Sequence, residues 1–207
     1  MTPSHDFSPF APLPGTEPPT RGVFVDRWGT LLALPPAGSC SRFAEAGFVE
    51  GAVNALFRAQ QAGWRVYLIG NEPEVAMGRT ARSTWERFEQ ELLEHLAGQG
   101  VHICRNYACL DDPEGQGPHR KPSVFRLPDT GLLYHAAQLD GVDLERSWVV
   151  GDGRAELAAG GRAGCGTIGV LTGCATVTEG PEVDPTLTLD SLVEAIEFLL
   201  GVPVETR

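Results

Sequence analysis

The chain has 207 residues, a formal net charge of −11 at pH 7, 42% hydrophobic residues and 21% charged residues. This length fits one domain that can bury a hydrophobic core. The negative charge argues against nucleic-acid and anionic-membrane partners, because polyanions would be repelled on average. No apolar stretch approaches the roughly 20 residues that span a bilayer, and the N-terminus lacks the features of a signal peptide. We therefore expect a cytoplasmic protein.

The N-terminal segment differs in composition from the rest of the chain. Residues 1–20 are rich in proline and lack a periodic apolar pattern, so we expect a flexible tail there and a single domain over residues 21–207. The five cysteines are dispersed and form no Cys-x-x-Cys pair. This pattern favours reduced thiols over a disulfide framework.

Short apolar runs alternate with amphipathic stretches from Arg21 onward. The apolar runs predict buried strands over 23–26, 66–69, 101–104, 148–152 and 167–171. Apolar residues at helical spacing predict helices around 53–57, 85–96, 132–139, 154–164 and 192–199. Repeated strand–helix units with right-handed crossovers predict an α/β fold, a three-layer doubly wound parallel sheet.

Polar residues stand where predicted strands end. Asp26, Asn71 and Asp152 occupy such positions, and the carboxyl ends of parallel strands meet at the edge where open α/β sheets bind ligands. Two carboxylates brought together would repel each other, whereas Mg²⁺ accepts carboxylate and phosphate oxygens. Lys121 would neutralise phosphate charge. The set predicts phosphoryl transfer through an aspartate nucleophile.

Four short segments, taken in order, resemble the motifs of the haloacid dehalogenase (HAD) superfamily. Residues 26–30 read Asp-Arg-Trp-Gly-Thr, and the later segments read Gly-Asn at 70–71, Lys-Pro at 121–122 and Val-Gly-Asp at 150–152. Longer matches at 48–53, 63–71, 120–122 and 147–152 resemble the branch of D-glycero-D-manno-heptose 1,7-bisphosphate phosphatases and histidinol phosphatases. The resemblance, which covers roughly residues 21 to 173, implies a HAD-like Rossmannoid fold. We expect it to be capless, because 31–48 is short and 71–121 holds one helix, one strand and a loop.

The resemblance also implies roles for particular residues. Asp26 would attack phosphorus, and water would hydrolyse the resulting phospho-aspartate beside Mg²⁺. The metal ligands would be Asp26, the backbone carbonyl of Trp28 and Asp152, with Glu156 as a longer-armed candidate. The remaining implied site residues would bind phosphate, balance its charge or hold a sugar phosphate: Gly29, Thr30, Gly70, Asn71, Arg120 and Lys121.

Three positions depart from the family pattern. Trp28 replaces the general-acid aspartate, and an indole can neither protonate a leaving alkoxide nor activate water. Gly70 replaces a Ser or Thr that donates a hydrogen bond to phosphate, and Glu156 replaces an aspartate.

Two classes of function therefore stay open. One is a phosphatase for a small phosphorylated metabolite, such as a heptose bisphosphate or histidinol phosphate, slowed or suited to good leaving groups. The other is an inactive binding or regulatory module that acts through a protein partner. A haloacid dehalogenase, which has an aromatic residue at the position of Trp28, is a third alternative, but it would need a helical cap.

A zinc loop is common in this branch, with a Cys-x-His and a Cys-x-Cys pair. The corresponding positions here are Cys104, Asn106, Gly117 and His119, which cannot form a closed tetrahedral site. A substitute set would consist of His102, Cys104, Cys109 and His119. We favour a loop without zinc.

Overall fold

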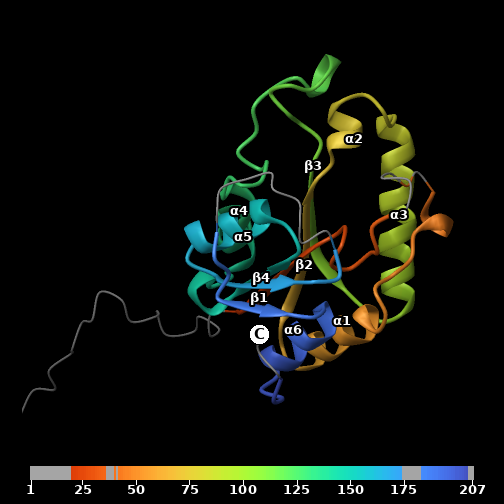
Figure 1. Ribbon diagram of the computed structural model, residues 1–207. Helices are drawn as coiled ribbons and strands as arrows, with labels where there is room; N and C mark the ends of the chain where they lie inside the picture. Colours follow the sequence, from red (N-terminus) through yellow and green to blue (C-terminus); the bar gives the residue numbers. More distant parts are fainter. Residues whose placement is uncertain (1–19, 36–39, 41, 174–182, 205–207) are drawn as a thin grey trace, which may run out of the picture.

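The computed structural model describes residues 20–35, 40, 42–173 and 183–204. Its described strands form one six-stranded, all-parallel sheet in the order β3-β2-β1-β4-β5-β6 (Figure 1). The strands are β1 (Gly22–Asp26), β2 (Arg65–Asn71), β3 (Ile103–Cys109), β4 (Trp148–Gly151), β5 (Gly166–Val170) and β6 (Leu187–Leu189). The predicted doubly wound α/β fold is therefore confirmed. The expected tail lies outside the described residues except for Thr20.

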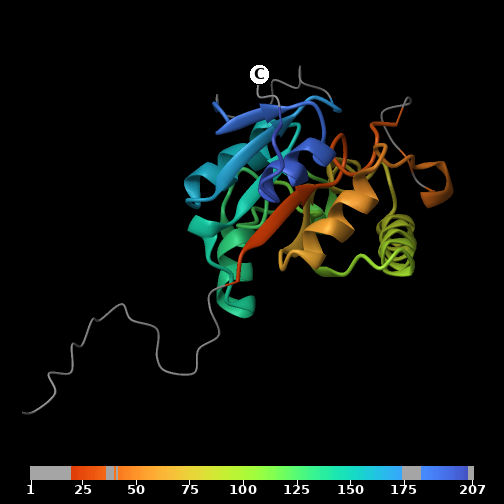
Figure 2. The same ribbon diagram turned by 90° about the horizontal axis from the view of Figure 1, so that it is seen from below.

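Helices cover both faces of the sheet (Figures 1 and 2). The described α-helices are α1 (Ala52–Gln61), α2 (Pro73–Ala76), α3 (Arg82–Gly98), α4 (Gly131–Asp140), α5 (Arg154–Arg162) and α6 (Leu192–Leu199). Buried residues of α1, α3 and α6 pack against one face, and those of α4 and α5 pack against the other. None of these helices is long and apolar enough to span a bilayer.

The central strands alternate their side chains between two hydrophobic cores. In β1, Val23 and Val25 join the core under α1, α3 and α6, whereas Phe24 joins the core under α4 and α5. These three side chains are fully buried. Because successive side chains of a strand point to opposite faces, a central strand covered on both sides is apolar throughout. This explains why the apolar run preceding Asp26 was readable as a strand.

The edges of the sheet differ most from the sequence-based prediction. The strand expected at 101–104 begins at Ile103 and continues to Cys109. As an edge strand it pairs only with β2 and accommodates polar side chains, such as Arg105, which forms an ion pair with Asp140. The short edge strand β6 and the single turn of α2 were not predicted, because three or four residues give too little periodicity.

Candidate active site

Three acidic side chains converge at the carboxyl ends of β1 and β4. Asp26 is the last residue of β1, Asp152 follows β4 directly, and Glu156 lies in the first turn of α5. The two strands are paired, so their ends lie side by side. One carboxylate oxygen from each residue lies within 4.8 Å of the others. In the described part of the chain, this is the one such group of metal-ligating side chains.

The electrostatics of this group favour a cation. Burial, followed by the charges of Glu156 and Asp152, raises the pKa of Asp26 well above its usual value. Burial also raises the pKa of Glu156 to about 7, and Asp152 adds to this effect. Desolvation and like charge both disfavour the ionised forms, and a divalent cation would offset both. The donor set consists of one carboxylate at the end of β1, one directly after β4 and one in the first turn of α5, and it therefore fits Mg²⁺.

The turn after β1 packs tightly against the acidic group. Gly29 has φ +84°, and a Cβ there would lie 2.5 Å from Asp152 Cγ. A Cβ at Gly173 would lie 2.7 Å from Asp152 Cβ. The Thr172 hydroxyl donates to the Gly29 carbonyl at 2.7 Å, and the Thr30 hydroxyl lies 3.5 Å from Asp152 Oδ1. Glycine is therefore required at 29 by both backbone conformation and space.

The end of β2 builds the opposite wall. The Asn71 side-chain amide donates to the Leu127 carbonyl at 2.8 Å, and its oxygen accepts from the Leu127 N–H at 2.9 Å. Both residues line a pocket of about 220 Å³ together with Asp26, Glu156 and Arg126. Asn71 therefore fixes the loop that closes this pocket, and its side-chain amide is already engaged.

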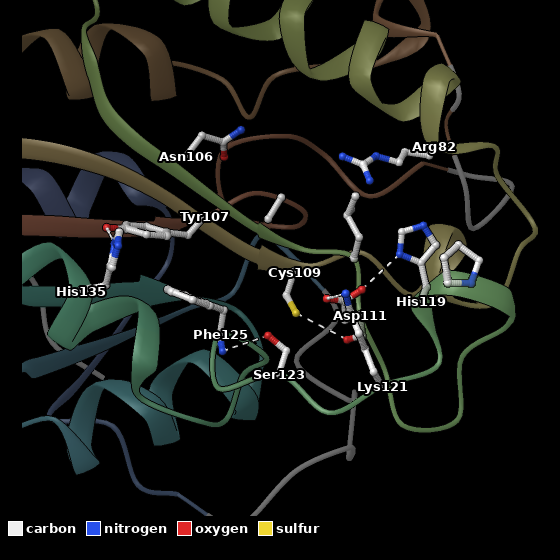
Figure 3. Close-up of a pocket in the computed structure, with 13 residues that line it drawn as sticks. Arg82, Asn106, Tyr107, Cys109, Asp111, His119, Lys121, Ser123, Phe125 and His135 are labelled. Carbon is white, nitrogen blue, oxygen red and sulfur yellow. Dashed lines mark hydrogen bonds and ion pairs between the residues drawn. The ribbon is translucent and has the colours of Figure 1, made fainter.

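Two of the predicted site residues lie beside the acidic pocket and not in its lining. Lys121 Nζ is 3.3 Å from Asp111 Oδ2, and Lys121 lines an adjoining pocket of about 410 Å³ that shares Cys109 and Asp111 with the acidic one (Figure 3). Arg120 is exposed. Neither residue lines the pocket that contains Asp26. The structure thus brings together Asp26, Asn71, Asp152 and Glu156 but not the Arg-Lys pair.

A basic residue that the sequence analysis missed lines the acidic pocket instead. Arg126 reaches Asp112, with 2.6 Å between Nη2 and Oδ2, and both residues line the pocket. Arg126-Leu127-Pro128 repeats, six residues downstream, the Arg-x-Pro pattern of 120–122. This repetition was the available signal, and the structure carries the second triplet to the pocket.

The positions that correspond to the family's zinc loop are divided between β3 and the loop after it. Cys104 and Asn106 lie within β3, and Asn106 accepts a hydrogen bond from Arg27 at 2.5 Å. The residues that approach His119 come from the end of the strand: Asp111 Oδ1 is 3.2 Å from His119 Nδ1, and the Cys109 thiol contacts the Asp111 carbonyl (Figure 3). Cys104 and Asn106 thus lie inside a strand and not in the loop that holds His119, because β3 is longer than predicted.

The two residues after Asp26 point toward α3. Arg27 is 1% exposed and forms an ion pair with Glu72. Trp28 stacks on Phe88 of α3 with 5.5 Å between ring centroids. The side chain that replaces the family's general acid is thus part of an aromatic contact with α3.

Comparison with known proteins identifies relatives over most of the chain. The HAD-hydrolase-like family model matches residues 124–195. A D-glycero-beta-D-manno-heptose-1,7-bisphosphate 7-phosphatase of Haemophilus ducreyi is 30% identical over 86% of this chain and 98% of its own length. The Mesorhizobium japonicum protein of the same name is 31% identical over 88% of this chain and 85% of its own.

A solved structure supports the same assignment. The D,D-heptose 1,7-bisphosphate phosphatase from B. bronchiseptica, complexed with magnesium and phosphate, superposes with a TM-score of 0.75 at 26% identity, covering 88% of this chain and 99% of that one. These relatives carry enzyme names and so lend no support to an inactive binding module. The chain belongs to the HAD-like hydrolases, in the family of the heptose-1,7-bisphosphate 7-phosphatases.

Proposed function

We propose that this protein is a Mg²⁺-dependent phosphatase that hydrolyses a small phosphorylated metabolite through an aspartyl-phosphate intermediate. The observation that supports this most directly is the carboxylate group of Asp26, Asp152 and Glu156 at the ends of two paired strands. The names of the relatives make a heptose bisphosphate the first substrate to test. Histidinol phosphate, which the resemblance of the sequence motifs implies, is the second.

Asp26 is the proposed nucleophile. Its carboxylate oxygen attacks phosphorus, the bond from phosphorus to the leaving-group oxygen breaks, and the electron pair departs with that oxygen. Water then attacks the phospho-aspartate, which releases inorganic phosphate and restores Asp26. When bound by Asp26, Asp152, Glu156 and the Trp28 carbonyl, Mg²⁺ supplies charge neutralisation for the phosphoryl oxygens.

The protein's own groups position the phosphate. Gly29, Thr30 and Gly70 form the proposed cradle at the ends of β1 and β2, and Asn71 holds the wall opposite. Arg126 lines the pocket and is the basic side chain placed to balance phosphate charge. Lys121 and Arg120 do not line this pocket: Lys121 pairs with Asp111, and Arg120 is exposed.

Phosphate release from a panel of phosphorylated sugars and p-nitrophenyl phosphate tests the proposal. We expect turnover that requires Mg²⁺, is abolished by a chelator, and falls at least ~10³-fold in Asp26→Asn, because the amide is no nucleophile. The Asp129→Asn variant, at an exposed acidic position, is the matched control. Equal activity of wild type and Asp26→Asn on every substrate would overturn the proposal.

A further inference from the structure

A second pocket, apolar and aromatic, lies next to the acidic one. It measures about 260 Å³ and is lined by Trp28, Trp85 and Phe88, with Leu34, Pro73 and Val75 adding aliphatic surface. Phe88 and Val75 are buried, and Trp28 and Trp85 are partly buried. An apolar cavity of this kind binds a flat apolar group by the hydrophobic effect and by ring stacking.

The two pockets share a wall. Asn71, Glu72 and Pro73, the segment at the end of β2, line both of them. Trp28, which lines the aromatic pocket, is two residues from Asp26 and occupies the position from which the family's acid serves the leaving group. For a phosphate ester held at Asp26, the aromatic pocket is thus the cavity that adjoins the acidic pocket on the side of Trp28 and β2.

The polar side chains of the aromatic pocket are largely engaged elsewhere. Glu72 forms an ion pair with Arg27, and Glu74 forms one with Arg79. The Asn71 amide is held by Leu127. The hydroxyls of a sugar would find few free partners there, and burying them unpaired would cost free energy. An uncharged ring matches this lining better than a polyol.

The size of the pocket and the chemistry at Trp28 agree with such a group. An apolar cavity of ~150 Å³ takes one benzene molecule, so about 260 Å³ has room for one or two fused rings. A phenol, with a pKa of about 10, leaves as a stable anion, whereas an alkoxide is roughly as basic as hydroxide and needs an acid. Trp28 removes the acid and supplies a surface for the ring.

We propose that Trp28, Trp85 and Phe88 form a leaving-group pocket for an aryl or fused-ring group, and that aryl phosphate monoesters are the preferred substrate class. This inference rests on the proposed phosphatase function. Asp26 attacks phosphorus, the bond between phosphorus and the aryl oxygen breaks, and the aryloxide departs with the electron pair and takes its proton from bulk water. Water then cleaves the phospho-aspartate, giving inorganic phosphate.

The test compares three substrates that differ in the ring and in the leaving group. 1-Naphthyl phosphate has a ring and a good leaving group, acetyl phosphate has a good leaving group without a ring, and a heptose bisphosphate has neither. We expect kcat/KM for 1-naphthyl phosphate to exceed the values for the other two at least ~10-fold, which corresponds to about 1.4 kcal/mol. A higher kcat/KM for the heptose bisphosphate would overturn the inference and leave the proposed function standing.

Variants locate the ring. Trp85→Ala is expected to raise KM for 1-naphthyl phosphate about 10-fold and KM for acetyl phosphate less than two-fold, because only the first places a ring against the indole. Trp85 also contacts the Arg27 guanidinium, so a second variant that keeps this contact is needed. Thr80 lines the pocket, and Thr80→Trp, which fills it, is expected to have the same effects on the two KM values. Phe57→Ala removes an exposed aromatic ring of α1 and should change neither KM.

The outcomes separate the two proposals. Equal effects of Trp85→Ala and Thr80→Trp on both substrates would overturn the leaving-group pocket, since they would report a general disturbance of the site. If no substrate is hydrolysed in a way that depends on Asp26, the phosphatase function and the leaving-group pocket are overturned together. A preference for 1-naphthyl phosphate that both variants remove would support both.

Discussion

Gly29→Ala tests the tight packing of the turn after Asp26 against Asp152. Gly29 and Gly63 share φ +84°, but a Cβ at 63 meets nothing within 4 Å, whereas one at 29 lies 2.5 Å from Asp152 Cγ and 2.7 Å from Oδ1. Alanine in this left-handed conformation costs ~1–2 kcal/mol, and the less flexible unfolded chain returns ~0.4–1 kcal/mol. We therefore expect Gly63→Ala to lose about 1 kcal/mol, and Gly29→Ala to lose ~1–3 kcal/mol more from overpacking.

The displaced carboxylate has a second consequence. Asp152 is a proposed metal ligand, so Gly29→Ala should also weaken Mg²⁺ binding. At about 100 times its Kd, Mg²⁺ stabilises a native protein by ~2.7 kcal/mol. Chemical denaturation with and without Mg²⁺ should show this gain in the wild type and in Gly63→Ala, and little of it in Gly29→Ala. If the two variants unfold alike and gain alike from Mg²⁺, the packing argument is refuted.

Three further changes probe the electrostatics, the loop and the leaving group. Burial raises the pKa of Glu89 to about 7 from 4.5, so the free energy of unfolding of the native protein falls as pH rises through that window. Glu89→Gln removes this titration. The stability of the variant relative to wild type should therefore be about 1 kcal/mol higher at pH 8 than at pH 5, a figure that allows for the partial exposure of the side chain. A gain independent of pH would contradict that cause. Asn71→Ala should lose about 2 kcal/mol of stability in denaturation experiments because it leaves the Leu127 N–H and carbonyl without partners. The control Asn54→Ala, at an exposed position, should lose under ~0.5 kcal/mol. Similar losses in the two variants would refute the role of Asn71 in holding Leu127. Trp28→Asp should raise kcat for alkyl phosphates ~10²-fold and leave acetyl phosphate nearly unchanged, because only an alkoxide needs a proton; equal changes for both would argue against an acid at this position.

The sequence was most informative where strands are buried on both faces. Asp26 and Asp152 follow short apolar runs in central strands, so the bounds of those strands and the position of each carboxylate could be predicted. Edge strands lack this pattern. In β3, polar residues that are partly exposed or form ion pairs interrupt the apolar run. The strand therefore ends at Cys109, five residues later than predicted, and it contains Cys104 and Asn106.

The basic residue of the pocket could not be chosen from the sequence for a different reason. Two Arg-x-Pro triplets stand six residues apart, and local propensity treats them alike. A long-range contact brings the second triplet to the pocket, since Asn71 binds Leu127 from 56 positions away, whereas Asp111, in the same loop as the first triplet, holds Lys121 in the neighbouring pocket. Such contacts depend on how the end of β2 meets the loop before α4, and no window of sequence contains both.

The departures from the family pattern have a common chemical consequence. Trp28 removes the proton donor for the leaving group, and Gly70 removes a hydroxyl from the phosphate cradle. Both changes lower assistance to a poor leaving group, while three carboxylates that fit a metal are present, with Glu156 in place of an aspartate. A phosphate ester whose leaving group departs as a stable anion needs least of what is missing. The aromatic wall beside Asp26 would supply, through binding of that leaving group, free energy that acid catalysis no longer provides.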